Sequence, residues 1–237
     1  MTNVSAQAKP RMAQIKLGAP LPSPLLGNKT SLSRKARAEI DALRGPNAAQ
    51  FLIQTLSAWA VIFAAAGIST RTHLALRFYL PAIFVIATRQ NLLGLLVHEQ
   101  AHYLGFRSKA GELFANLVTA YPLLITTEDY AKVHLSHHTF YFTEKDPDYL
   151  RKQGDEWTFP FKRTKLLKLL LGDLAGINAW KTLKGKKMRE TYIGKRKTET
   201  PKWVRALFYG LMATVFTLLK IWKLFFFRWL VPLITIF

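Results

Sequence analysis

Five of the six histidines in this chain form two groups whose spacing suits metal binding. The stretch "HEQAH" places His98 and His102 at positions i and i+4, about 40° apart around a helix, so both imidazoles can reach one ion. The stretch "HLSHH" places His134, His137 and His138 at i, i+3 and i+4, on one helical stripe. The chain has no cysteine, so any metal held here would have nitrogen and oxygen ligands.

Two kinds of metal chemistry fit these residues. "HEQAH" alone matches the zinc-protease pattern HExxH, in which Glu99 would be the general base and one further ligand would suffice. The surplus of histidines favours a site for two metal ions instead. Nitrogen-rich ligation with some oxygen suits iron, which can activate dioxygen, whereas zinc has no redox chemistry. The histidine count therefore favours oxidation, and a membrane zinc protease stays as an alternative.

Long apolar runs determine where these histidines lie. Crossing the hydrocarbon core takes about 20 apolar residues in a helix. The sequence has four long apolar runs, at residues 51–68, 74–97, 204–219 and 221–237. The last two are individually of marginal length, and Lys220 and Lys223 mark the turn between them. We therefore predict an all-α integral membrane protein with about four transmembrane helices in two hairpins, and a cytoplasmic helical cap that carries the histidine groups.

The second run leads directly to the first histidine group. Arg89, Gln90 and Asn91 interrupt it, and a charge deep in hydrocarbon is costly. The favourable arrangement puts Arg89 near the headgroups and lets the helix continue past the membrane. From Arg89 to His98 the helix would rise about 13 Å, which would place "HEQAH" above the bilayer surface.

The net charge of +20 is concentrated before residue 45 and between residues 132 and 205. Basic residues beside apolar spans indicate the cytoplasmic face, so we expect the N-terminus and the histidine groups there, and His73 in a short loop on the opposite side. No recognised motif supports nucleic-acid binding. We predict a basic cytoplasmic segment over residues 1–48 and a membrane domain over 49–237.

Shorter segments complete the predicted organisation. Residues 33–43 could form a short helix, and the apolar stretch 112–126 is too short to be a span and fits a cytosolic or half-inserted helix. Residues 161–180 form a basic amphipathic helix, which would lie either in the membrane interface or on the protein's own cytoplasmic domain. Residues 185–200 read as a basic, solvated loop.

"HEQAH", followed about thirty residues later by "HLSHH" and then by "DPD", resembles the membrane fatty acid desaturase family. The resemblance implies helical hairpins, histidine boxes on the cytoplasmic side and an oxygen-dependent site with two iron ions. Matched by position, the five histidines of the two boxes would be iron ligands. Glu99, Asp146 and Asp148 match positions better suited to support the ligands, where a carboxylate that accepts an imidazole N–H fixes its orientation. The alternative for the two aspartates is a solvated turn.

The same resemblance implies the reaction and its partners. Two hydrogens would be removed from adjacent carbons of a lipid acyl chain, with dioxygen as oxidant and electrons from a separate ferredoxin or cytochrome b5-like donor. A related lipid hydroxylase would use similar boxes. The basic region could dock an acidic donor or hold the membrane surface.

The chain departs from the family pattern in one respect. The family carries a third histidine box after the second hairpin, and no histidine follows His138. We therefore expect a fragment or a truncated form, in which five imidazoles hold metal weakly and the 237 residues alone do not desaturate lipids. A non-catalytic membrane protein is the third alternative.

Overall fold

The computed structural model describes residues 33–43, 45–152, 157–177, 180 and 199–236. All regular structure within these residues is helical, with no strand. The chain divides into two units, Met1–Gly45 and Pro46–Phe237. The described part of the first unit contains α1 (Arg34–Leu43), which matches the helix predicted at residues 33–43. The predicted loop at residues 185–200 lies almost entirely outside the described residues.

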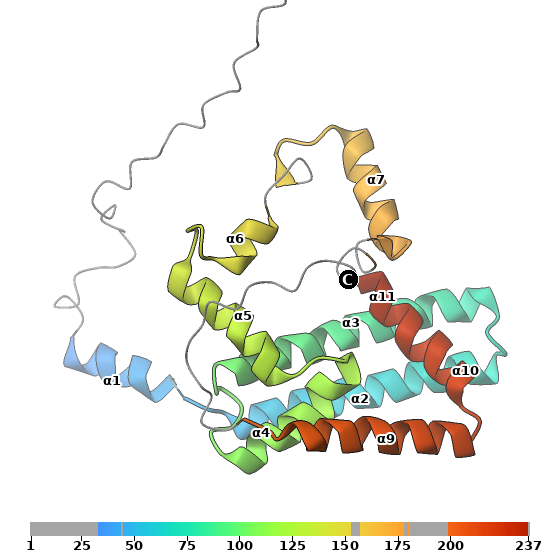
Figure 1. Cartoon of the computed structure of the whole chain (residues 1–237), viewed down its shortest axis with the longest axis horizontal. Coiled ribbons are helices and arrows are strands. Elements are labelled where there is room, and N and C mark those ends of the chain that lie inside the picture. Colours follow the sequence, from blue (N-terminus) through green and yellow to red (C-terminus); the bar gives the residue numbers. More distant parts are fainter. Residues whose placement is uncertain (1–32, 44, 153–156, 178–179, 181–198, 237) are drawn as a thin grey trace, which may run out of the picture. The chain divides into compact units, whose positions relative to one another are not determined.

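The centre of the second unit is an antiparallel helix pair, α2 (Ala48–Arg71) and α3 (Leu76–Ala101). Small residues such as Ala58 and Ala82 are buried, which allows close helix packing of the kind found in membranes. Phe63 and Phe84 point outward and are about 70% exposed (67% and 71%). Both helices are long and apolar enough to cross a bilayer. In Figure 1 the two lie side by side.

The remaining apolar sequence forms α9 (Lys202–Leu218), α10 (Trp222–Phe225), the π-helical turn η4 (Phe226–Leu230) and α11 (Val231–Ile236). The two halves of this segment meet at a bend of 118°, and they qualify as a membrane span only when taken together. By length and composition the described residues thus contain two candidate spans, or three if the bent pair is one span. The all-α membrane fold is confirmed, with fewer candidate spans than the four apolar runs predict.

Ring stacking and hydrogen bonds hold this C-terminal segment against the pair formed by α2 and α3. The Trp229 ring stacks on Trp59 of α2 at 5.2 Å, and Gln90 Nε2 of α3 donates to the Trp229 carbonyl at 2.9 Å. Arg228 Nε donates to Ser69 Oγ at 2.9 Å. Because polar groups buried in an apolar surrounding need partners, these bonds fix where the segment can sit.

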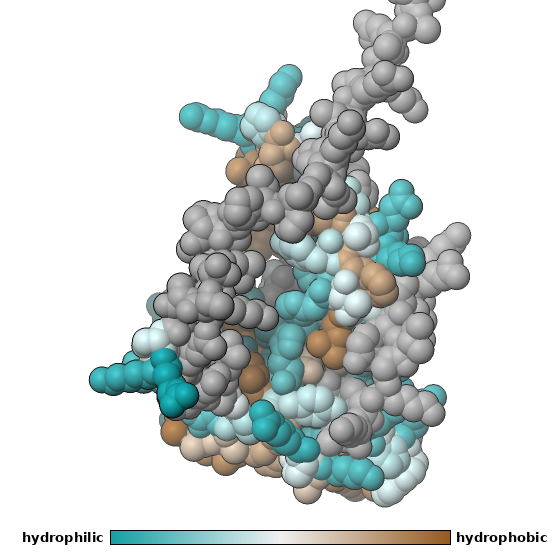
Figure 2. All heavy atoms as spheres, turned by 90° about the vertical axis from the view of Figure 1, so that its left-hand side faces the viewer, coloured by the Kyte–Doolittle hydropathy of each residue, from teal (hydrophilic) through white to brown (hydrophobic). Residues whose placement is uncertain are grey.

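Shorter helices connect the two parts and form the cap. They are α4 (Lys109–Ala115), the π-helical turn η1 (Asn116–Ala120), the 3₁₀ turn η2 (Tyr121–Leu123), α5 (Thr127–Phe140), α6 (Pro147–Arg151) and α7 (Arg163–Leu174). The stretch predicted as one short helix at 112–126 is thus three consecutive helical pieces, ending at Leu124 with φ of 64°. Figure 2 views the end where α3 finishes and α5 lies, and hydrophilic side chains are visible on it beside hydrophobic ones.

The predicted continuation of α3 past the polar triplet is confirmed. The helix runs unbroken through Arg89 and Gln90 and ends at Ala101, with His102 as its C-cap. His73 lies, as predicted, in the turn between α2 and α3. The long α3 therefore links a span directly to the first histidine group.

Candidate metal centre

The C-terminal turn of α3 supplies the first two imidazoles. The His98 and His102 rings lie one turn apart with centroids 5.0 Å from each other. Between them, the buried Gln100 side chain points the other way, where Nε2 donates to the Phe106 carbonyl at 3.0 Å and Oε1 accepts from the Phe106 N–H at 2.9 Å. Gln100 Nε2 also donates to the buried Glu112 carboxylate at 2.6 Å. These bonds hold the end of α3 and so orient the two histidines.

Helix α5 supplies the second group. Its N-cap, Thr126, accepts from the Asp129 N–H at 2.9 Å, and Glu128 and Asp129 in the first turn are favourably placed for the helix dipole. The helix packs against α3. Its histidines fall in the last two turns, so that this packing brings the two groups together.

Four of the five histidines converge on one point. His98, His102, His134 and His138 each offer a ring nitrogen, and these nitrogens all lie within 4.8 Å of one another. His134 Nε2 is central, 2.8 Å from His102 Nε2 and 3.0 Å from His138 Nε2. Two nitrogens bound at right angles to one ion at about 2.1 Å would be about 3.0 Å apart. The donor set and its spacing therefore fit a metal ion.

The protonation state of His134 suits the same role. Burial, with the neighbouring imidazoles adding repulsion, lowers the pKa of His134 to about 4. Its ring is therefore neutral near pH 7, and a neutral imidazole is the form that binds metals.

His137 makes a different contact. Its Nδ1 lies 2.9 and 3.0 Å from the two Asp146 oxygens, and it is not part of the four-nitrogen cluster. Asp146 is fully buried and also accepts the N–H groups of Phe142 and Asp148, both at 2.9 Å. Burial alone would raise the pKa of Asp146, but the hydrogen bonds from His137 and from backbone N–H groups outweigh it and lower the pKa. The carboxylate thus fixes Nδ1 of His137 and takes no part in a contact with Nε2.

The other two acids predicted to support the site differ in their contacts. Glu99 Oε1 lies 3.4 Å from His98 Nδ1, with its side chain about half exposed (45%). Asp148 Oδ2 lies 3.5 Å from Lys152 Nζ in the following turn of α6. Asp146 therefore makes the closest carboxylate–histidine contact of the three.

The comparison with protein families completes this description. Residues 75–237 match the family model described as fatty acid desaturase, which covers α3, the histidine cluster and everything that follows. The chain belongs to the fatty acid desaturase family. No match was found among curated proteins or among solved structures. Membership of the desaturase family implies an oxidoreductase, an acyl substrate and dioxygen.

Tyr130 of this desaturase-family chain is a neighbour of the cluster that the sequence reasoning missed. Its ring stacks on His134 with centroids 5.4 Å apart and an interplanar angle of 22°. It also lies edge-on to His98, at 6.4 Å. Tyr130 precedes His134 by one helical turn, so the i, i+4 spacing on α5 was a usable signal.

A buried hydrogen-bond cluster, here called the Asn116 clamp, holds the start of α5. Asn116 Nδ2 donates to both Glu128 oxygens, at 2.9 and 3.1 Å, and its Oδ1 accepts the Thr127 N–H at 2.9 Å. Thr200, just before α9, adds its N–H to Glu128 at 2.8 Å. Asn116 and Thr127 are fully buried, and Glu128 is nearly so. The clamp ties η1, α5 and the approach to α9 to one another.

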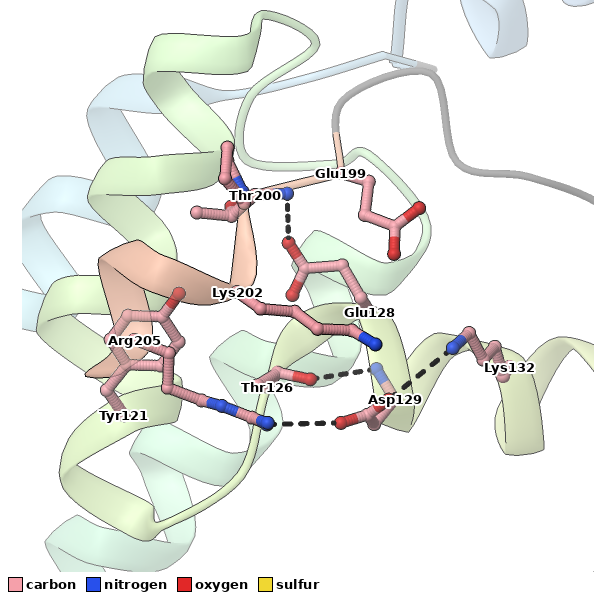
Figure 3. Close-up of a pocket in the computed structure, with 10 residues that line it drawn as sticks. Tyr121, Thr126, Glu128, Asp129, Lys132, Glu199, Thr200, Lys202 and Arg205 are labelled. Carbon is pink, nitrogen blue, oxygen red and sulfur yellow. Dashed lines mark hydrogen bonds and ion pairs between the residues drawn. The ribbon is translucent and has the colours of Figure 1, made fainter. Parts of the chain in front are cut away.

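A polar pocket of about 270 Å³ lies beside the clamp, between the first turns of α5 and α9 (Figure 3). Arg205 and Lys132 each pair with Asp129 at 3.5 Å. Burial, with the Glu128 carboxylate nearby, raises the pKa of Tyr121 in its wall to about 12, so that phenol stays protonated. Acidic and basic side chains offset one another here, as in a salt-bridged junction between two helices.

Proposed function

We propose that this chain forms the histidine-box part of an oxygen-dependent acyl desaturase, which introduces a double bond into a lipid acyl chain. Family membership supports the reaction class. The observation that carries the proposal is the meeting of four imidazoles, two from α3 and two from α5, with nitrogens within 4.8 Å. A family match alone would not say that this chain retains a metal-binding arrangement.

The ligands would be His98, His102, His134, His137 and His138, which would take part in binding two iron ions in the complete enzyme. Bound iron would supply the activation of dioxygen that removal of two hydrogens from adjacent acyl carbons requires. With two electrons from a separate donor, such as a ferredoxin or a cytochrome b5-like protein, dioxygen would be reduced to water.

The chain's own residues would hold and orient this centre. Asp146 accepts from His137 Nδ1, so it fixes the tautomer in which Nε2 carries the lone pair and raises its basicity. Glu99 would act in the same way on His98, at a longer distance. Asp148 would act indirectly, because its N–H donates to Asp146.

Placement at the membrane would bring the acyl substrate to the site. With residues 1–48 and the cap on the cytoplasmic side, the turn with His73 would be external, and α3 would lead from the bilayer to the histidines. The acyl chain would then approach from the bilayer side and the donor from the cytoplasm.

To test the proposal, host cells that express the complete enzyme containing this chain are supplied with a saturated fatty acid fully labelled with deuterium and are compared with cells that lack the enzyme. Desaturation yields a product that has lost two deuterons, whereas hydroxylation yields one that has lost one deuteron and gained an oxygen. The purified protein is analysed for iron and zinc in parallel. Iron with the doubly depleted product supports the proposal, and zinc alone with unchanged lipids would contradict it.

A further inference from the structure

Helix α7 presents a leucine stripe to its surroundings. Five leucines at helical spacing are each about half exposed or more: Leu166, Leu167, Leu170, Leu171 and Leu174. None of the residues of α7 is buried. An apolar stripe of this length is unfavourable in water and indicates an interaction surface.

The described part of the protein does not cover this stripe. Near the C-terminal end of α7, Gly176 is buried and lies so close to Ile234 of α11 that an added Cβ would meet it at 2.6 Å. Helix α7 thus contacts α11 near its C-terminal end, and its five leucines stay exposed.

Charge and aromatic residues around α7 determine which partner fits. Residues 162–174 include four basic residues and one acidic residue. Lys165 and Lys168 lie on the side away from the stripe, at about 170° and 130° from its centre. Exposed aromatic side chains flank the helix at both ends, with Trp157 and Phe159 before it and Trp180 after it.

We infer that α7 lies in the interface of the leaflet that faces the histidine cluster, with its leucine stripe among the acyl chains and its lysines at anionic headgroups. Leucines on one face, lysines on the other and aromatic residues at the boundary are the features of an interfacial helix. Contact with α11 keeps α7 beside the membrane domain. The inference depends on membrane insertion of α2 and α3, and not on the proposed reaction.

Fluorescent dyes attached to single introduced cysteines test the position of α7 in the full chain, which has no cysteine of its own. Leu170→Cys and Lys168→Cys would carry an environment-sensitive dye, with the protein reconstituted in phosphatidylcholine vesicles containing 30% phosphatidylglycerol. Leu80→Cys on α3, 60% exposed, is the lipid-facing control. Lipids with a doxyl group on the acyl chain quench dyes in the bilayer, and iodide quenches dyes in water.

We expect doxyl lipids to quench the Leu170 dye at least twofold, as they quench the Leu80 dye, and iodide to quench the Lys168 dye. Leu167→Cys provides a second position on the stripe, in case one variant folds poorly. Quenching of both stripe dyes by iodide would overturn the inference. So would stripe dyes that neither quencher reaches, because protein would then cover the leucines.

A second experiment tests whether anionic lipid contributes to the binding of α7. In vesicles of phosphatidylcholine alone, the Leu170 dye should be quenched less by doxyl lipids than in vesicles with phosphatidylglycerol, and Lys165→Gln with Lys168→Gln should remove that difference. Doxyl quenching that is equal in both vesicles would remove the role assigned to anionic lipid.

Discussion

At the scale of single residues, His134 is the centre of the candidate site, because its Nε2 lies within 3.0 Å of two other histidine nitrogens. We predict that His134→Ala or His138→Ala abolishes unsaturated product in an active form of the enzyme and lowers metal bound per chain, while the protein still inserts into the membrane. The matched control is His73→Ala, in the turn that precedes α3, at the opposite end of that helix from the cluster. Near-normal product from either cluster variant would remove the ligand assignment.

Asp146 gives a second prediction at this scale. Asp146→Asn keeps the size of a buried side chain that accepts several N–H groups, but removes the charge that orients His137. We expect metal affinity to fall about 10- to 100-fold, as for other groups that orient a metal-bound histidine. Asp148→Asn, whose carboxylate pairs with Lys152, should change it little. Equal affinities for the two variants, measured by competition with a chelator, would contradict the role of Asp146.

At the scale of elements, the sequence predicted what depends on local pattern. Hydropathy indicated the helices, the polar triplet at Arg89 indicated a continuous α3, and the spacing of the histidines indicated two ligand groups. The separation of His137 from the other four was not predictable, since it depends on Asp146 nine positions away, across a turn. The turn predicted at Lys220 and Lys223 is present after α9, but its angle of 118° could not be predicted, because it depends on distant contacts such as Trp229 with Trp59.

The Asn116 clamp is another non-local feature, joining residues up to 84 positions apart. We predict that Asn116→Ala lowers the free energy of unfolding by about 2–3 kcal/mol, because it removes the partner of the buried Thr127 N–H and leaves the buried Glu128 carboxylate with the Thr200 N–H in place of three N–H contacts. Metal affinity should fall with it, since α5 carries three of the histidines. Thr139→Ala, exposed on the same helix, is the control. Unfolding in detergent, followed by circular dichroism, gives the comparison, and unchanged stability would show that the clamp is dispensable.

At the scale of the whole molecule, the membrane domain positions a polar site at the end of an apolar helix pair. Trp229, Gln90 and Arg228 bind the C-terminal segment to α2 and α3. Trp229 and its stacking partner Trp59 also reach the shorter helices: Trp229 Nε1 donates to the Pro122 carbonyl and Trp59 Nε1 to the Val118 carbonyl, both at 2.8 Å, so the bundle and the segment that leads to α5 are stabilised together.

The orientation of this arrangement across the bilayer is the final prediction. Basic residues are concentrated before residue 45 and in 132–205, and α2 and α3 separate these two regions by an even number of crossings. Both regions should therefore lie in the cytoplasm, with the turn after α2 outside. The exposed positions Arg71 and Lys145 allow single cysteines, Arg71→Cys and Lys145→Cys, in a chain that otherwise has none. An impermeant maleimide should label Arg71→Cys in intact cells, and Lys145→Cys only after permeabilisation. Labelling of Lys145→Cys alone in intact cells would reverse the orientation and would place the histidine cluster on the outer face.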